Sequence, residues 1–290
     1  HFHDVRNCTD EEIVHLSRSL EIDIAFDLKG CTQGCRPRIF ALRAAPIQIN
    51  YLGYPGSMGV SYIDYIIADR IVIPEHLKDQ YSEKVIYLDG CYQPQDTTRK
   101  LNTQVINREQ FGLPEDGFIY CCFNNNYKIT PEILYSWSII LKKRKNSYLW
   151  LLEDTPYASL NLKREFINNG LDPLRIIFAK RTEISIHLAR QQLADVFIDT
   201  FPCNAHTTAS DTILAGLPLI TYTGKVFASR VARSIIKSIQ SQSIETDNSS
   251  HYEKVAIDFI PSKCKRLTST FSIDKYIQSF EKNIIRCTQC

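Results

Sequence analysis

The sequence predicts an α/β protein in which helices cover both faces of a parallel sheet. Short apolar runs rich in isoleucine, valine and tyrosine alternate with longer segments of helical periodicity. Runs that are apolar throughout are typical of strands buried on both faces. From residue 117 onward the order is strand, helix, strand, helix, which indicates a doubly wound parallel sheet.

The first predicted element is a helix, because TDEE supplies an N-cap threonine and an acidic first turn before IVHLSRSL. The apolar runs predicted as strands are 22–28, 45–53, 64–68, 84–88, 117–123, 147–152, 174–179, 194–200 and 217–222. Helical periodicity covers 130–143, 159–169, 183–193, 206–216 and 226–239, and two further helical segments follow at 249–258 and 273–286.

Two polar stretches divide the chain into three predicted parts. Residues 90–110 contain few apolar side chains, and the alternation of strands and helices restarts after them. A second polar connection, SQSIETDNSS, begins at residue 241. We therefore expect an N-terminal lobe over 1–105, a second lobe over 106–240 and a helical C-terminal segment over 241–290.

Composition narrows the class of protein. The 290 residues are 44% hydrophobic, which is enough for buried cores, and 34 basic against 32 acidic residues give a formal net charge of +2. This balance favours neither nucleic acid nor an anionic membrane as a partner. The sequence contains no run of 18 apolar residues, and its first residues lack the apolar core of a signal peptide. Of its ten cysteines, Cys121 and Cys122 lie inside an apolar predicted strand, as buried thiols do. We expect a cytoplasmic protein with reduced thiols.

The segment FPCNAHTTASD follows the predicted strand 194–200 and opens the next helix. A helix start with free backbone N–H groups, the imidazole of His206 and the hydroxyls of Thr207 and Thr208 favours an anion. Asp211 lies one turn further along the same face, where its carboxylate can accept hydrogen bonds from a sugar diol. A ligand that contains both a phosphate and a ribose indicates a nucleotide. The alternative interpretation is a simple N-cap.

Two other segments contribute polar side chains near strand ends. CCFNNNYKITPEIL places Lys128 where it could reach a phosphate at the neighbouring helix start, and His187 and Arg190 share a face of the helix before strand 194–200. Either of the last two could instead be a surface or structural group. YLGYPGSMG permits a tight turn and a close backbone approach, but it contains neither the dinucleotide fingerprint nor a P-loop lysine.

Several segments in order resemble the catalytic region of the O-linked N-acetylglucosamine transferases, including bacterial relatives that carry tetratricopeptide repeats. They are APIQINYLGYPGSMGVSYIDYIIAD, YSEKVIYL, FGLPEDGFIYCCFNNNYKITPEIL, NSYLWLL, RIIFAKRTEISIHLARQQLADVFIDTFPCNAHTTASDTILAGLPLIT and ASRVA. The resemblance covers about residues 20 to 285 and is strongest from 110 to 235. It implies two facing Rossmann-like lobes of the GT-B type. It also implies an inverting, metal-independent transfer from UDP-N-acetylglucosamine to serine or threonine hydroxyls of proteins, with no cofactor besides the donor.

The resemblance also implies roles for individual residues. Lys128 and His206 are expected to be catalytic and, with Thr207 and Thr208, to bind the diphosphate, while Asp211 takes the ribose. The remaining expected donor contacts are His187 and Arg190 at the uracil, Leu52, Gly53 and Cys203 at the sugar, and Asn125 in the loop before Lys128. No metal ligand is expected.

The sequence departs from the family pattern in identifiable places. Asn125 stands where the family usually has glutamine, and Ile184 stands where a lysine near the ribose is expected. The family's first strand and its D-F-x-x-H-type segment would precede residue 1, and no tetratricopeptide repeat is present. We therefore expect an N-terminally truncated chain with an incomplete first lobe, and we assign the missing role to neither His1 nor His3.

Three alternatives stay open. The first is the same fold with another UDP-hexose donor, such as UDP-glucose; fucosyl-type enzymes of this architecture differ at His206 and Asp211. The second is a lobe that binds nucleotide or a protein partner without turnover. The third is a zinc site formed by the thiols of CTQGC (31–35) and CTQC (287–290).

Overall fold

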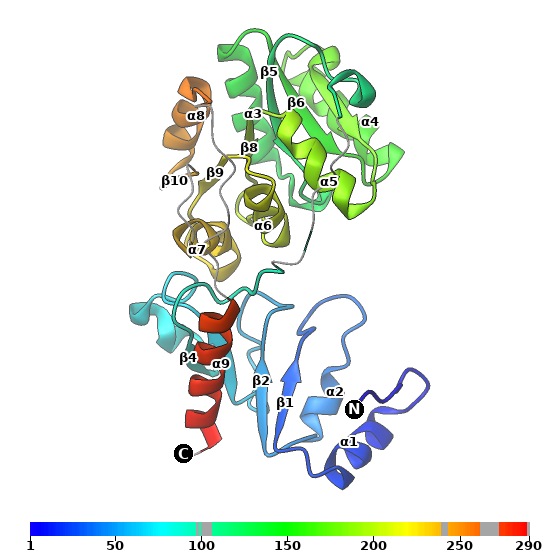
Figure 1. The fold of residues 1–290 in the computed structure, drawn as a ribbon, viewed down its shortest axis with the longest axis vertical. Helices are drawn as coiled ribbons and strands as arrows, with labels where there is room; N and C mark the ends of the chain where they lie inside the picture. The colour runs from blue at the N-terminus through cyan, green and yellow to red at the C-terminus, as the bar shows by residue number, and fades with distance from the viewer. Residues whose placement is uncertain (97–98, 100–105, 239–242, 262–272, 289–290) are drawn as a thin grey trace. The chain divides into compact units, whose positions relative to one another are not determined.

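The computed structural model describes residues 1–96, 99, 106–238, 243–261 and 273–288. The chain forms two compact units, unit 1 with residues 1–94 and 272–290 and unit 2 with residues 95–271. Each unit contains a parallel sheet with helices packed on it (Figure 1), which confirms the predicted α/β class. Within the described ranges, no helix is both long enough and apolar enough to cross a membrane.

Unit 1 is built on four parallel strands in the order β1-β2-β3-β4. Its elements are α1 (Asp10–Ser19), β1 (Ile24–Asp27), α2 (Pro37–Ala41), β2 (Ile47–Asn50), β3 (Tyr65–Ala68), β4 (Lys84–Tyr87) and α9 (Ile273–Thr288). Helix α1 begins as predicted, because Thr9 and Glu12 form a reciprocal capping box. Helix α9 returns from the far end of the chain and packs against β4. Its Phe280 ring stacks on Phe26 of β1 at a centroid distance of 6.0 Å.

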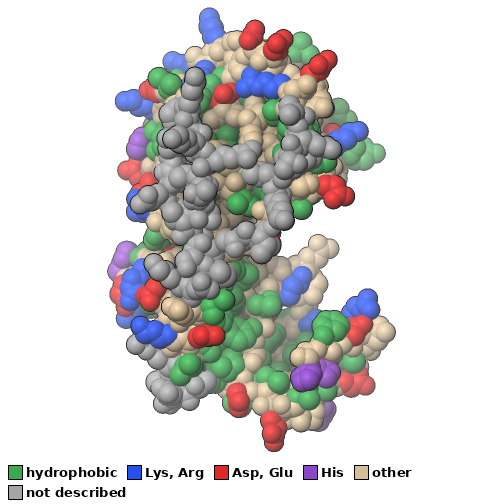
Figure 2. All heavy atoms as spheres, viewed as in Figure 1, with side chains coloured by type: hydrophobic (Ala, Val, Ile, Leu, Met, Phe, Trp, Pro, Cys, Tyr) green, Lys and Arg blue, Asp and Glu red, His purple; other side chains and the backbone are tan. Residues whose placement is uncertain are grey.

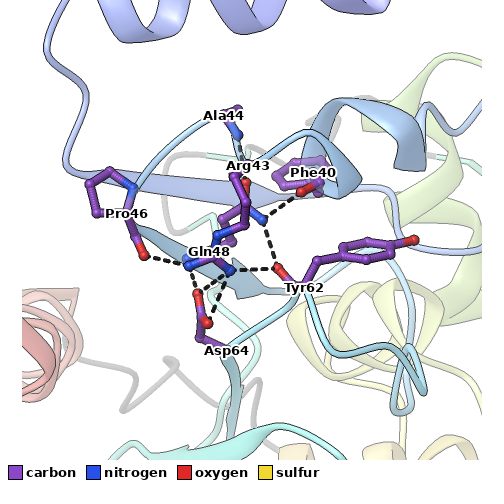
Figure 3. Close-up of polar contacts among 7 residues, drawn as sticks. All are labelled: Phe40, Arg43, Ala44, Pro46, Gln48, Tyr62 and Asp64. Atoms are coloured by element: carbon purple, nitrogen blue, oxygen red, sulfur yellow. Dashed lines mark hydrogen bonds and ion pairs between the residues drawn. The ribbon is translucent and has the colours of Figure 1, made fainter.

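A polar network fixes the amino ends of β2 and β3. Its members are Phe40, Arg43, Ala44, Pro46, Gln48, Tyr62 and Asp64 (Figure 3). The Gln48 side chain is fully buried and its amide is satisfied on both sides. Its Nε2 donates to the carbonyls of Phe40 at 2.8 Å and Tyr62 at 2.6 Å, and its Oε1 accepts from the Ala44 N–H at 2.9 Å. Ligands of parallel sheets bind at the opposite, carboxyl end of the strands. The network therefore serves packing and strand register.

Unit 2 is built on six parallel strands in the order β10-β9-β8-β5-β6-β7. Its strands are β5 (Phe118–Cys122), β6 (Ser147–Leu152), β7 (Ile176–Ala179), β8 (Val196–Ile198), β9 (Leu219–Tyr222) and β10 (Ile244–Thr246). Its α-helices are α3 (Pro131–Lys143), α4 (Pro156–Asn168), α5 (Ile184–Arg190), α6 (Thr207–Leu214), α7 (Val231–Ser238) and α8 (Ser249–Asp258).

This strand order is that of a Rossmann fold, with β5 in the first position and β8 in the fourth. Helix α3 packs against α4 and α8, while α6 packs against α5 and α7, so that helices cover both faces of the sheet (Figure 1). The large side chains of Trp137, Trp150 and Phe197 are fully buried in the core. The direction of chain progression reverses between β5 and β8, and the carboxyl ends of these two strands form the topological switch point.

Among the described strands and α-helices, β10 and α2 were not predicted from the sequence. Strand β10 lies inside the polar stretch SQSIETDNSS, where only Thr246 of its three residues is buried. Helix α2 is only five residues long and begins with a proline. The predicted boundaries at residues 105 and 240 lie outside the described residues. The predicted part 241–290 is shared between the units, because β10 and α8 belong to unit 2 and α9 to unit 1.

Charged side chains of both signs are interspersed on the face of the molecule shown in Figure 2. This mixture agrees with the nearly balanced composition of 34 basic and 32 acidic residues. Hydrophobic side chains gather on the part of unit 1 that is visible in the same view.

Candidate functional site

The loops that leave β5 and β8 meet at the switch point of unit 2. Lys128 lies at the end of the short 3₁₀ helix η3 (Asn126–Lys128) after β5, and its Nζ donates to the backbone carbonyl of Asn204, after β8, at 2.6 Å. The two residues are 76 positions apart in the sequence. Lys128 therefore lies beside the start of the neighbouring helix α6, because Asn204 is two residues before His206, the N-cap of α6.

His206 is held as a neutral imidazole at the start of α6. Its Nε2 lies 3.2 Å from the carbonyl oxygen of Ala228, and because a carbonyl only accepts, Nε2 carries the proton. Burial first, and then the charge of the Lys128 ammonium, lowers the pKa of His206 to about 3. The His206 side chain makes no capping hydrogen bond to the helix backbone. Thr207 and Thr208 form the first two positions of α6 and are exposed and half-buried, respectively.

Asp211 lies one turn into α6, on the same face as Thr207. Its carboxylate is nearly buried, and burial raises its pKa in spite of a cation beside it. That cation is Arg99, whose Nη1 lies 2.5 Å from Asp211 Oδ1. The carboxylate expected to receive a ribose is therefore occupied by an arginine in this structure.

His187 and Arg190 come together on α5, as their spacing predicts. Arg190 is 1% exposed, and its guanidinium donates to the Lys180 carbonyl at 2.6 Å and to His187 Nδ1 at 2.9 Å. The His187 ring packs on Phe123 at a centroid distance of 5.3 Å. Burial, followed by the charges of Arg190 and Arg181, lowers the pKa of His187 to about 4. Since Arg190 only donates, Nδ1 of His187 accepts and the second ring nitrogen carries the proton.

Asn125 is exposed at the carboxyl end of β5, and its Oδ1 accepts from Arg181 at 3.2 Å. Arg181 also pairs with Asp154, at 2.6 Å. The loops after β5, β6 and β7 are thus linked through a single guanidinium. Ile184, where the family has a lysine, is about half exposed at the first position of α5.

The residues expected at the sugar end fall into different units. Cys203 is half-buried in unit 2, in the loop before α6. Leu52 and Gly53 lie in unit 1, in the turn after β2, where Leu52 has a φ of 74°. A Cβ at Gly53 would lie 2.0 Å from the Leu28 carbonyl oxygen, so this turn requires glycine.

Sequence reasoning missed the buried residue at the centre of this arrangement. Asp199 directly follows β8 and is fully buried, and it accepts hydrogen bonds from the loop after β5, from the loop before α6 and from β9. The available signal was a carboxylate at the end of the apolar run VFIDT, where a buried charge requires partners. Arg99 and Arg181 carried no comparable signal, because both lie in polar loops.

The zinc alternative gains no support from the described residues, among which no group of three or more His, Cys, Asp or Glu side chains is placed to hold a metal ion. Cys31 is exposed and Cys35 half-buried, both as free thiols. Cys290, of the second thiol pair, lies outside the described residues.

Comparison with known proteins identifies relatives of this chain. It is 38% identical over 272 residues to the probable UDP-N-acetylglucosamine–peptide N-acetylglucosaminyltransferase SEC of Arabidopsis thaliana, with 91% of this chain and 28% of the relative covered. It is 26% identical over 347 residues to the UDP-N-acetylglucosamine–peptide N-acetylglucosaminyltransferase of Caenorhabditis elegans, covering 81% of this chain and 30% of the relative. The chain thus spans less than a third of the length of these curated relatives.

Among solved structures, a mutant of the Thermobaculum terrenum O-GlcNAc transferase superposes with a TM-score of 0.80 at 25% identity, over 98% of this chain and 52% of that one. A protein from Anabaena, Alr3699/HepE, in complex with UDP and glucose shares the fold at a TM-score of 0.56 and 12% identity, over 89% of this chain and 73% of that one. These likenesses confirm the predicted GT-B architecture. The family described as Glycosyl transferase family 41 matches residues 7–102 and 93–270. The chain belongs to glycosyl transferase family 41.

Proposed function

We propose that the chain carries the donor site of an inverting, metal-independent glycosyltransferase that moves N-acetylglucosamine from UDP-N-acetylglucosamine to serine or threonine hydroxyls of proteins. The observation that carries the proposal is the contact of the Lys128 ammonium with the Asn204 carbonyl, at the point where α6 begins. A cation, a helix N-terminus and two threonine hydroxyls converge there, and together they suit a diphosphate.

The geometry suggests how the site acts on a UDP leaving group. Negative charge develops on the diphosphate as the bond between sugar and phosphate breaks, and the ammonium of Lys128 and the N–H groups at the start of α6 stabilise that charge. His206 is neutral, so it adds a dipole and shape to the site rather than a second charge. The Oδ1 of Asp211 offers a hydrogen-bond acceptor to a ribose hydroxyl, once Arg99 has moved from it.

The uracil would lie against α5. His187 presents a neutral ring fixed between Phe123 and Arg190, which suits stacking on a flat base. Arg190 would hold the His187 ring in place and not contact the base, because its guanidinium already donates to His187 and the Lys180 carbonyl. Of the residues expected at the sugar, Cys203 lies in the same unit as this site and stays a proposed contact. The buried free thiols of Cys121 and Cys122 support the expected cytoplasmic location.

The donor site is tested by measuring UDP binding to Lys128→Ala by titration calorimetry. Loss of a phosphate cation from a desolvated site costs on the order of 2–4 kcal/mol, so we expect UDP affinity to fall by about 30-fold or more. Lys145→Ala, which removes an exposed lysine next to the amino end of β6, is the matched control and should bind like wild type. Equal UDP affinity in wild type and Lys128→Ala would reject the assignment.

Transfer is tested separately. Acceptor peptides rich in serine and threonine are incubated with the protein and either UDP-N-acetylglucosamine or UDP-glucose, and the products are weighed by mass spectrometry. A mass increase of one N-acetylhexosamine, absent with Lys128→Ala, supports the proposed reaction. A mass increase of one hexose alone would show that the donor is UDP-glucose and not UDP-N-acetylglucosamine. UDP binding without any product would leave a nucleotide-binding protein and reject the transferase.

A further inference from the structure

Asp199 is a fully buried carboxylate that ties together the separate loops of the proposed site. Its Oδ1 accepts from the backbone N–H groups of Thr200 and Ala205, both at 2.7 Å, and from Asn124 Nδ2 at 3.1 Å. Its Oδ2 accepts from the hydroxyl of Thr221, on β9, at 2.7 Å. The carboxylate therefore accepts hydrogen bonds from three chain segments, two of which meet at Oδ1.

The donors to Oδ1 lie directly next to the residues proposed to bind the donor nucleotide. Asn124 begins the loop that leads to Lys128, and it also donates to Thr200 Oγ1 at 2.8 Å. Ala205 immediately precedes His206, the N-cap of α6. By contrast, Thr221 lies on β9, a strand that contributes no residue to the proposed site. The two oxygens of Asp199 thus separate a site-facing set of hydrogen bonds from a set that only joins strands.

The backbone of Asp199 is fixed as well. Its carbonyl accepts from the hydroxyl of Tyr252, on α8, at 2.8 Å, and that hydroxyl in turn accepts from Trp137 Nε1, on α3, at 2.9 Å. Both aromatic side chains are fully buried. Two helices on one face of the sheet therefore fix the position of the carboxylate. The hydrogen bonds that its Oδ1 accepts then fix the loops after β5 and β8 relative to it.

We propose that Asp199 is a positioning residue for the donor nucleotide. It holds the start of α6 and the Lys128 loop at the spacing that a diphosphate requires, without touching the nucleotide itself. This inference rests on the proposed function of the same site. It requires the hydrogen bonds accepted by Oδ1 and not the one accepted by Oδ2.

The test compares three variants by UDP calorimetry. Asp199→Ala removes every side-chain acceptor, and we expect UDP affinity to fall at least tenfold. In Asp199→Asn the amide oxygen can still accept from Thr200, Ala205 and Asn124 while the amide nitrogen donates to Thr221, so we expect affinity within about threefold of wild type. Thr221→Val removes only the hydrogen bond to Oδ2, and it should keep UDP affinity within about twofold even if its thermal stability falls.

Amide hydrogen exchange over residues 199–208 supplies a direct readout of loop position. We expect the Ala205 amide to lose protection in Asp199→Ala and to keep it in Thr221→Val. If Asp199→Ala does not fold, Asn124→Ala takes its place, because it removes one site-facing donor and leaves the carboxylate paired elsewhere.

The outcomes separate this inference from the function on which it rests. Failure of the wild-type protein to bind UDP would reject the proposed function. Wild-type binding together with unchanged affinity in Asp199→Ala would reject the positioning role alone. An affinity loss in Thr221→Val as large as that in Asp199→Ala would also reject it, because general loosening of the sheet would then account for both.

Discussion

The ion pair between Arg99 and Asp211 should weaken nucleotide binding by an amount that can be estimated from its burial. Arg99 is 32% exposed and Asp211 is 11% exposed at the side chain, so the pair lies between the surface and buried classes. Exposed pairs contribute about 0.2–1 kcal/mol, and breaking a buried pair costs about 3–5 kcal/mol. We take about 1–2 kcal/mol as the free energy needed to break this ion pair when a ribose binds, which corresponds to roughly a 5- to 30-fold change in UDP affinity.

We therefore expect Arg99→Gln to bind UDP roughly 5- to 30-fold more tightly than wild type in titration calorimetry at low salt. The gain should shrink as salt is added, because screening already weakens the pair in wild type. It should also shrink for 2′-deoxy-UDP, which has one ribose hydroxyl fewer to offer Asp211. Arg164→Gln, which removes an arginine on α4 that is 69% exposed, is the control and should bind like wild type. Weaker binding by Arg99→Gln would refute the reasoning and would indicate that Arg99 contacts the nucleotide itself.

Two further predictions concern stability. Gln48→Leu leaves the Ala44 N–H without a partner, whereas the Phe40 and Tyr62 carbonyls each keep a hydrogen bond from Arg43. We therefore expect a loss of about 1–3 kcal/mol in urea unfolding, the cost of one buried unpaired group; Gln80→Leu at an exposed site should change stability by less than about 0.5 kcal/mol. His187 and His206 have folded-state pKa values of about 4 and about 3, below that of an unfolded histidine, so the unfolded state binds more protons below pH 6.5. Each should cost about 1 kcal/mol of stability between pH 7 and 5.5, partly offset by Asp199, whose pKa burial raises to about 6. His187→Gln should remove about half of the histidine contribution in thermal melts, and an unchanged pH slope would contradict the assigned neutral state.

The strands of the sheets were predictable from sequence because parallel strands buried on both faces are apolar throughout. Strand β8 shows the principle, since all of its residues are buried. Strand β10 escaped prediction for the opposite reason: it lies at the edge of the sheet, next to β9 alone, and Ile244 and Glu245 are only half-buried. Edge strands need little apolar character, and sequence periodicity does not report them.

The placement of the candidate site residues was predictable where they follow the ends of strands, and less so where burial decides their surroundings. Lys128 and the start of α6 meet because parallel strands deliver their carboxyl ends to the same edge. The spacing of His187 and Arg190 placed them on one helix face, but it could not show that Arg190 is buried among Phe123 and Trp150. The pair between Arg99 and Asp211 joins residues 112 positions apart, which no local pattern reports.

The return of α9 to unit 1 has a consequence for dividing this chain. Phe280 stacks on Phe26 and also packs on Tyr51 at a ring-centroid distance of 5.5 Å, so residues near the end of the sequence complete the core of the first sheet. A fragment that ends at residue 94 would expose these two rings, whereas removal of the residues after 272 would damage the unit that begins the chain and spare the one that precedes the cut. Unit 1 can therefore be made on its own only by joining its two segments through a linker, whereas unit 2 is one continuous segment.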